Sequence, residues 1–233
     1  MIPAPRTTDQ AAFDQLFTDG RKALLNGTHR CQERPVDDSP RWGISALMRP
    51  DPSAAEVLDQ ITHLATAAAG GAHWTTGAAV SSHLTLRSLE PFRSHVPVDD
   101  PLVERYAVAL RAAAARIGPI RFAVTGLTLT PQSVMACAMP ADSAADDLAA
   151  AYADALGSDG WHEGEFKRDF WYLNLVHFAE PIARPGELVD FVAERRTAKL
   201  ADLLVAEIQI SQWCHAGTGM LPITRACVTP SRA

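Results

Sequence analysis

The sequence lacks an excess of positive charge and lacks any long hydrophobic run. Its 233 residues include 21 Lys and Arg against 27 Asp and Glu, which gives a formal net charge of -6. Such a chain has no overall positive field that would attract duplex DNA or an anionic membrane. No stretch approaches the ~18 uninterrupted apolar residues of a transmembrane helix, and the first residues do not resemble a signal peptide. We therefore expect a cytoplasmic protein that binds neither membranes nor duplex DNA.

Cysteine motifs and glycine-rich phosphate loops are also missing. The four cysteines (Cys31, Cys137, Cys214 and Cys227) form no C-x-x-C pair and no Cys–His ligand pattern. This spacing indicates neither a zinc knuckle nor a disulfide scaffold. The glycines form neither a G-x-G-x-x-G motif nor a P-loop, so nothing points to a dinucleotide or a nucleoside triphosphate. We expect no metal and no cofactor.

The remaining pattern alternates strands and helices, with 47% hydrophobic residues to build a core. Residues 1–40 are predicted to form an N-terminal extension, in which an amphipathic helix at 8–25 precedes a polar loop that contains prolines. Residues 41–233 are predicted to form one main domain without a separable linker. Its expected strands are 42–48, 75–89, 120–130, 133–140, 170–181 and 203–213, with helices between most of them. A strand–helix unit that ends in a histidine-bearing strand thus occurs twice.

The first histidine strand, "VSSHLTLRSL", carries a polar face. Side chains alternate along a strand, so four polar residues should point the same way: Ser81, His83, Thr85 and Arg87. A strand inside a covered sheet normally reads as apolar, so we expect this face to line a pocket. An imidazole can exchange a proton there while a hydroxyl two residues on holds a phosphoryl oxygen. Arg87 has two interpretations, a phosphate contact or an ion pair with Glu90.

The second histidine strand, "WYLNLVHFAEP", has a different character. A second imidazole at His177 would complete an acid–base pair, because histidine has both protonation states accessible near neutrality. Alternation would place it on an apolar face with Leu173, Leu175 and Ala179, so a core histidine is the competing interpretation. A third alternative puts Asn174 in the place of the histidine.

The residues before this histidine offer a further pair of interpretations. Trp171 and Tyr172 follow Lys167 and Arg168. This group could form a basic rim on which a nucleobase stacks, or it could simply pack where the strand begins.

These two strands give the sequence a resemblance to the 2H phosphoesterase superfamily, the two-histidine proteins with paired H-x-[ST]-x motifs. His83-Leu84-Thr85-Leu86 matches the first motif fully. His177-Phe178-Ala179-Glu180 keeps the second imidazole but has Ala179 where the family has a hydroxyl. By the order of elements the resemblance covers roughly Arg41 to Gln212.

The resemblance implies an α+β, bilobal and pseudo-symmetric fold, with two antiparallel-rich sheets flanking a central cleft and helices outside. It implies a metal-independent phosphodiesterase acting on a small cyclic phosphate or an RNA end. His83 and His177 would be general acid and base, and Thr85 would hold a phosphoryl oxygen. The expected substrate-binding residues are Ser81, Arg87, Ala179, Tyr172 and Trp171.

Two other functions stay open on the sequence, because the second motif is altered. The fold could carry out non-phosphate acid–base chemistry on a small metabolite, such as cyclisation, isomerisation or elimination. It could also serve as a non-catalytic ligand-binding module. One fold hosts many functions, so fold alone does not choose between these alternatives, and the oligomeric state is likewise open.

Overall fold

The computed structural model describes residues 7–164, 169–217 and 219–230 of the chain. Five helices lie in these ranges: α1 (Thr7–Leu25), α2 (Pro52–Ala69), α3 (Pro101–Ala114), α4 (Ala144–Leu156) and α5 (Pro185–Ala193). The strands are β1 (Ser45–Pro50), β2 (Trp74–Thr75), β3 (Leu84–Ser88), β4 (Arg121–Thr130), β5 (Ser133–Pro140), β6 (Trp171–His177), β7 (Ala201–His215) and β8 (Met220–Val228). Among the described helices, none has the length and apolar character needed to cross a membrane.

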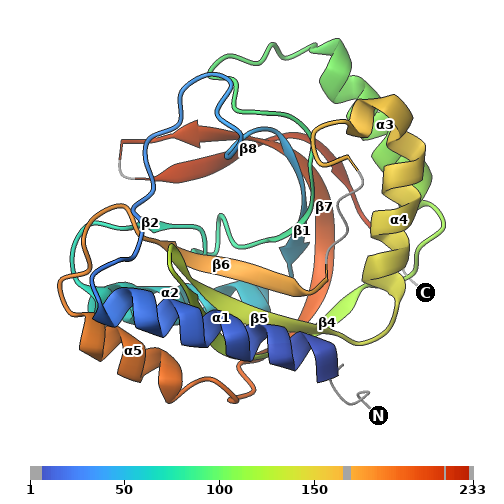
Figure 1. Cartoon of the computed structure of the whole chain (residues 1–233). Helices are drawn as coiled ribbons and strands as arrows, with labels where there is room; N and C mark the ends of the chain where they lie inside the picture. The colour runs from blue at the N-terminus through green and yellow to red at the C-terminus, as the bar shows by residue number, and fades with distance from the viewer. Residues whose placement is uncertain (1–6, 165–168, 218, 231–233) are drawn as a thin grey trace.

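The strands form one antiparallel sheet in the order β2-β6-β5-β4-β7-β1-β3, with β8 also paired to β7. The long strand β7 joins two halves. Its start, Ala201–Leu204, pairs with β4, and its remainder pairs with β1 and with β8. Figure 1 shows β7 curving from the β4–β5–β6 layer up to β8 and β1. This arrangement confirms the predicted α+β class with two antiparallel groups of strands.

Helices cover the outer sides of these groups. In Figure 1, α1, α2 and α5 lie along the half that contains β5 and β6, whereas α3 and α4 pack together at the other side of the molecule. Local signals fix their ends. The Asp51 carboxylate accepts from the backbone amides of Ser53 and Ala54 at the start of α2, and Pro52 occupies its first turn. Gly70, with φ of 65°, ends the same helix.

Two predicted strands need correction, and a third strand is missing from the prediction. The single strand expected at 75–89 is broken, because β2 pairs with β6 while β3 pairs with β1 in the other half, and residues 76–83 cross between them. The strand expected at 42–48 begins only at Ser45, since Trp42 has a φ of 68° that cannot continue a strand. β8 was not predicted, because Pro222 interrupts its pattern, which an edge strand tolerates.

A bulge in β6 has a specific support. Asn174 pairs with Met135 and Val176 with Val134, so Leu175 is an extra residue without a partner on β5. The Leu175 carbonyl instead accepts from the backbone amides of Thr76 and Gly77, at 3.1 and 3.2 Å. This approach requires glycine at 77, because a Cβ there would lie 2.0 Å from Thr62 Oγ1 and 3.0 Å from Leu175 Cα.

We expect Gly77→Ala to lower the free energy of unfolding by about 1–3 kcal/mol, because the added methyl group overfills the contact with Thr62 and Leu175. Urea unfolding measures this difference. Gly186→Ala is the matched control, since a Cβ at this position in α5 meets nothing within 4 Å. An unchanged stability of the Gly77 variant would contradict the close approach.

Candidate active site

A cavity of about 310 Å³ opens where the two halves of the sheet meet. Its wall combines imidazole, hydroxyl, amide, guanidinium and indole groups from several strands and loops. The lining residues are Pro40, Arg41, Trp42, Ser45, His83, Thr85, Ser88, Glu163, Tyr172, Asn174, His177 and Trp213. Polar groups that converge in one concave site are typical of a ligand-binding or active site.

His83 lies directly before β3, and Thr85 follows it within that strand. The His83 Nδ1 atom is 2.7 Å from the Ser81 carbonyl oxygen, so Nδ1–H donates to this carbonyl. This hydrogen bond occupies Nδ1–H and leaves Nε2, at the opposite edge of the ring, as the nitrogen that can gain or lose a proton. The ring also lies against the indole of Trp213, with centroids 5.0 Å apart. His83 and Thr85 therefore share the cavity wall, as the alternation of the strand predicts.

His177 ends β6 and is only 3% exposed. Its Nε2 atom lies 2.8 Å from Thr76 Oγ1, and its ring meets Trp42 edge to face at 4.8 Å between centroids. Burial lowers the pKa of His177 to about 3, and the nearby charges of Arg41 and His83 act in the same direction. His177 is therefore a neutral imidazole at physiological pH.

The Leu175 bulge decides which way His177 points. Simple alternation predicts that His177 shares a face with Leu173 and Leu175, but the extra residue changes the parity of the strand after Asn174. His177 thereby joins Tyr172 and Asn174 on the cavity wall. His177 therefore does not lie on the apolar face that simple alternation predicts. Asn174, the alternative to His177 in the second motif, lies in the same cavity.

Arg87 and Ser81 do not take the positions that strand alternation predicts. Arg87 is outside the cavity lining, because its Nη2 donates to the carbonyls of Gly160 and Gly164 at 2.9 and 2.8 Å. It does not pair with Glu90 either, since Glu90 binds Arg93. Ser81 contributes its carbonyl to His83, while its own hydroxyl lies 3.4 Å from the Ala78 carbonyl.

Trp171 and Ala179 also lie outside the cavity lining. Trp171 is 1% exposed, and its Nε1–H donates to Asp146 Oδ1 at 2.9 Å on the opposite face of β6. Ala179 packs against an apolar cluster that includes Trp74 and Trp213. Tyr172 does line the cavity, whereas Lys167 and Arg168 fall outside the described residues.

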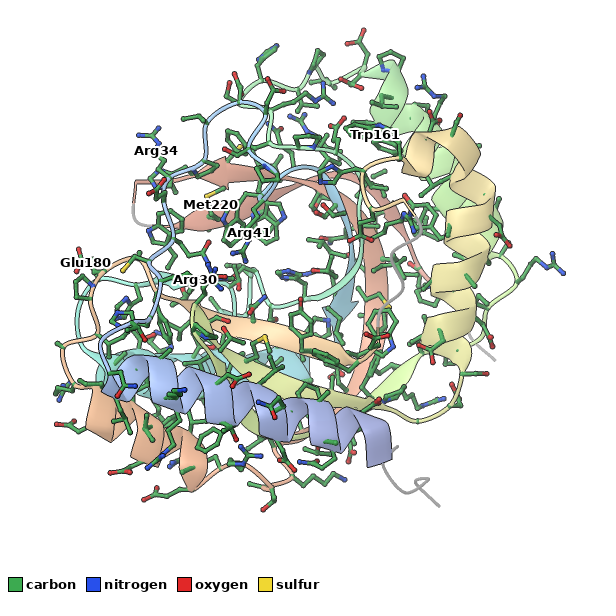
Figure 2. The ribbon with its side chains drawn as sticks, viewed as in Figure 1. Arg30, Arg34, Arg41, Trp161, Glu180 and Met220 are labelled. Atoms are coloured by element: carbon green, nitrogen blue, oxygen red, sulfur yellow. The ribbon has the colours of Figure 1, made fainter. Side chains whose placement is uncertain are left out.

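Several cavity residues were missed in the sequence, and the two most informative are Arg41 and Trp42. Arg41 comes from the loop after α1, and Figure 2 shows its side chain between β6 and the β7–β8 pair, whereas Arg34 points outward. Its Nη1 lies 3.3 Å from Gln132 Oε1, and desolvation lowers the pKa of Arg41, which remains a cation. A cation in a partly desolvated site attracts an anionic ligand more strongly than one in bulk water.

Trp42 holds a strained backbone position beside the two histidines. Its φ of 68° is rare for a bulky residue and costs energy, about 1–3 kcal/mol for strain of this kind. The Trp42 ring contacts His177 and also meets Trp213 at 5.3 Å, and Trp213 contacts His83. One feature of the sequence indicates that Trp42 has a special position: it is an aromatic residue directly before Gly43, at the end of a loop.

No family model and no curated protein matches this chain. Solved structures do match. TT0787 of Thermus thermophilus is 16% identical, covers 81% of this chain and 97% of its own, and superposes with a TM-score of 0.57. The chain has a LigT-like fold. Escherichia coli LigT complexed with 3'-AMP is 17% identical with a TM-score of 0.52, and LigT complexed with phosphate is 16% identical with a TM-score of 0.50. Each LigT structure covers 82% of this chain and 98% of its own.

The LigT-like fold is the one that the resemblance to two-histidine phosphoesterases implied, so the fold prediction is confirmed. At identities of 16–17% these structures show the fold alone. Within the described part of the chain, no group of three or more His, Cys, Asp and Glu side chains is placed to hold a metal ion.

The buried neutral His177 makes the stability of this LigT-like fold depend on pH. Its pKa is about 3 in the folded protein and about 6.5 for an unperturbed imidazole, so between these values the unfolded chain binds the extra proton. The contribution of His177 to the free energy of unfolding should therefore be complete above about pH 6.5. This contribution should decrease as the pH drops below about 6.5, because the unfolded chain then binds a proton that the folded protein does not.

Urea unfolding at about pH 7.5 and about pH 5 measures this loss, and His177→Gln should reduce it. A residual loss is expected from His73, because burial also lowers the pKa of His73. His63→Gln, at an exposed position on α2, is the matched control and should lose stability as the wild type does. Equal losses in the wild type and the His177 variant would refute the neutral, buried state.

Proposed function

We propose that this protein is a metal-independent phosphoesterase that hydrolyses a small nucleotide-like phosphodiester, such as a nucleoside 2',3'-cyclic phosphate or an RNA end. One observation carries the proposal: His83 and His177, from opposite halves of the sheet, line the same cavity together with Thr85 and Arg41. An acid–base pair beside a hydroxyl and a cation can bind a phosphoryl group and move protons around it. The fold supports this reading, because LigT structures are complexed with phosphate and with 3'-AMP.

The different states of the two histidines assign their roles. A neutral His177 has no second proton to supply near pH 7, so the role of general base is the one left to it. Burial, Arg41 and His83 oppose the proton that it would accept, and the negative charge of a bound phosphate would offset them. His83 is then the general acid, and its Nδ1–H bond to the Ser81 carbonyl holds the ring so that Nε2 is the nitrogen that carries the transferred proton.

In this reaction the water oxygen bonds to phosphorus while His177 accepts the water's proton. The bond from phosphorus to the leaving oxygen breaks, and that oxygen receives the proton of His83. The His177 Nδ1 atom is covered by protein in this structure, and the Trp42 ring contacts the imidazole. We therefore expect substrate entry to displace this indole so that water can reach the base.

Arg41 and Thr85 hold the phosphoryl oxygens in this proposal. The hydroxyl that Ala179 lacks would not have served here, because residue 179 packs in an apolar cluster outside the cavity lining. Arg41 provides a stronger interaction, since a charged donor to a phosphate oxygen is worth about twice a neutral one.

His83→Ala should lower kcat on nucleoside 2',3'-cyclic phosphates by about 10²–10⁴-fold, the usual contribution of a general acid or base. Steady-state kinetics with the wild type and the variant measure this change. His63→Ala is the control and should keep wild-type kinetics, because His63 is exposed on α2. An active His83 variant would refute the role of His83, and a wild type that is inert on a broad phosphodiester panel would refute phosphoester chemistry.

Arg41→Gln should raise KM by about 10-fold or more, because a lost charged hydrogen bond costs about 1.5–3 kcal/mol. Arg21→Gln on α1 is a control of the same charge change at an exposed position, and it should leave KM unchanged. If Arg41→Gln also leaves KM unchanged, Arg41 does not bind the substrate anion.

A further inference from the structure

Thr76 lies in the segment that connects the two halves of the sheet. It follows β2 directly, is 0% exposed, and makes two contacts with β6 through its hydroxyl. Thr76 Oγ1 lies 3.0 Å from the Asn174 carbonyl oxygen and 2.8 Å from His177 Nε2. These contacts join distant parts of the chain, since Thr76 and His177 are 101 residues apart in the sequence.

The two contacts together fix the position of a proton. A threonine hydroxyl has one proton to donate, whereas a backbone carbonyl can only accept. The Thr76 proton therefore goes to the Asn174 carbonyl. The hydroxyl oxygen must then accept at its other contact, so His177 Nε2 carries a hydrogen and donates it to Thr76.

The other ring nitrogen of His177, Nδ1, makes no comparable hydrogen bond to the described residues. Among the described residues, His177 Nδ1 is buried and has no hydrogen-bond partner. A buried polar atom without a partner is uncommon in folded proteins and calls for a functional explanation. Arg41 and His83 are the charged groups that act on this imidazole, and both disfavour a second proton on it. The neutral ring thus keeps a lone pair at the buried Nδ1 atom.

The backbone around Thr76 holds its hydroxyl in place. The amides of Thr76 and Gly77 donate to the Leu175 carbonyl at the β6 bulge, two residues before His177. The same short segment therefore supports the bulge that turns His177 to the cavity and contacts the ring itself. Rotation of the hydroxyl away from Nε2 would leave both the imidazole and the Asn174 carbonyl without this partner.

We infer that Thr76 is a positioning residue that locks His177 in its Nε2–H tautomer, so that the site works through Nδ1 of His177 and Nε2 of His83. The part of this inference that concerns catalysis rests on the proposed function, whereas the tautomer does not. The two histidines then present opposite nitrogens to the cavity, because His83 uses its Nδ1–H for the Ser81 carbonyl.

Long-range ¹H–¹⁵N correlation spectra of the ¹⁵N-labelled full chain test the tautomer directly. In the wild type we expect His177 to be the neutral Nε2–H form near neutral pH, with its signals identified by their absence in His177→Gln. Thr76→Ser should keep this form, and Thr76→Val should lose it in favour of a mixture with Nδ1–H. An Nδ1–H or charged His177 in the wild type overturns the inference, as does an unchanged tautomer in Thr76→Val.

Kinetics test the consequence for catalysis. Thr76→Val should lower kcat by about 10-fold with little change in KM, and Thr76→Ser should restore most of it, because an oriented base acts on the reacting water. Thr66→Val is the matched control, since it removes a hydroxyl bond to a backbone carbonyl within α2, away from the cavity lining. In this control the His177 tautomer and kcat should match the wild type.

The two readouts separate the two possible failures. If Thr76→Val loses the tautomer and keeps full kcat, the positioning role is wrong. If the wild type has the Nε2–H tautomer but hydrolyses no phosphodiester, the proposed function is wrong and the assignment of the proton stands.

Discussion

The site depends on one carbonyl group that the sheet leaves unpaired. At the β6 bulge the Leu175 carbonyl receives the amides of Thr76 and Gly77 instead of a partner on β5. A buried carbonyl without a donor would be costly, so this pair of hydrogen bonds makes the bulge stable. The bulge in turn changes the direction of His177. Without it, the imidazole would face the apolar side of β6 and the cavity would hold one histidine.

The cavity wall holds both a cation, Arg41, and a carboxylate, Glu163. The chain carries a formal net charge of -6, yet Arg41 reaches the cavity and its charge adds to the burial that keeps His177 neutral. A cation in a partly desolvated site can attract an anion even when the whole protein repels it. The two imidazoles have different surroundings: His177 is buried and neutral, whereas His83 lies against Trp213 and donates to the Ser81 carbonyl.

Aromatic rings connect the two halves of the site. Trp42 contacts His177, Trp213 contacts His83, and the two indoles meet each other. The strained backbone at Trp42 is tolerated because this packing compensates for it. A residue held in an unfavourable conformation at a cavity wall can change position when a ligand replaces its contacts. The indole is thus well placed to respond to what enters the cavity.

The sequence by itself determined the features that depend on neighbouring residues. The spacing of His83 and Thr85 put both on one wall, and the periodicity of apolar residues located the N-terminal helix. It also carried the resemblance that predicted the fold, which the match to LigT confirms. Local rules failed at Arg87, because a partner distant in the sequence, the Gly160 carbonyl, decides where that side chain goes.

Only the tertiary structure decided how the second half of the site is built. Strand alternation is a property of consecutive residues, but a bulge depends on donors that another segment brings to it. The contact of Thr76 with His177, the approach of Arg41 from the loop after α1, and the place of Ala179 in an apolar cluster all arise when distant segments meet. The sequence therefore located both histidines, and the folded chain determined the surroundings of each ring.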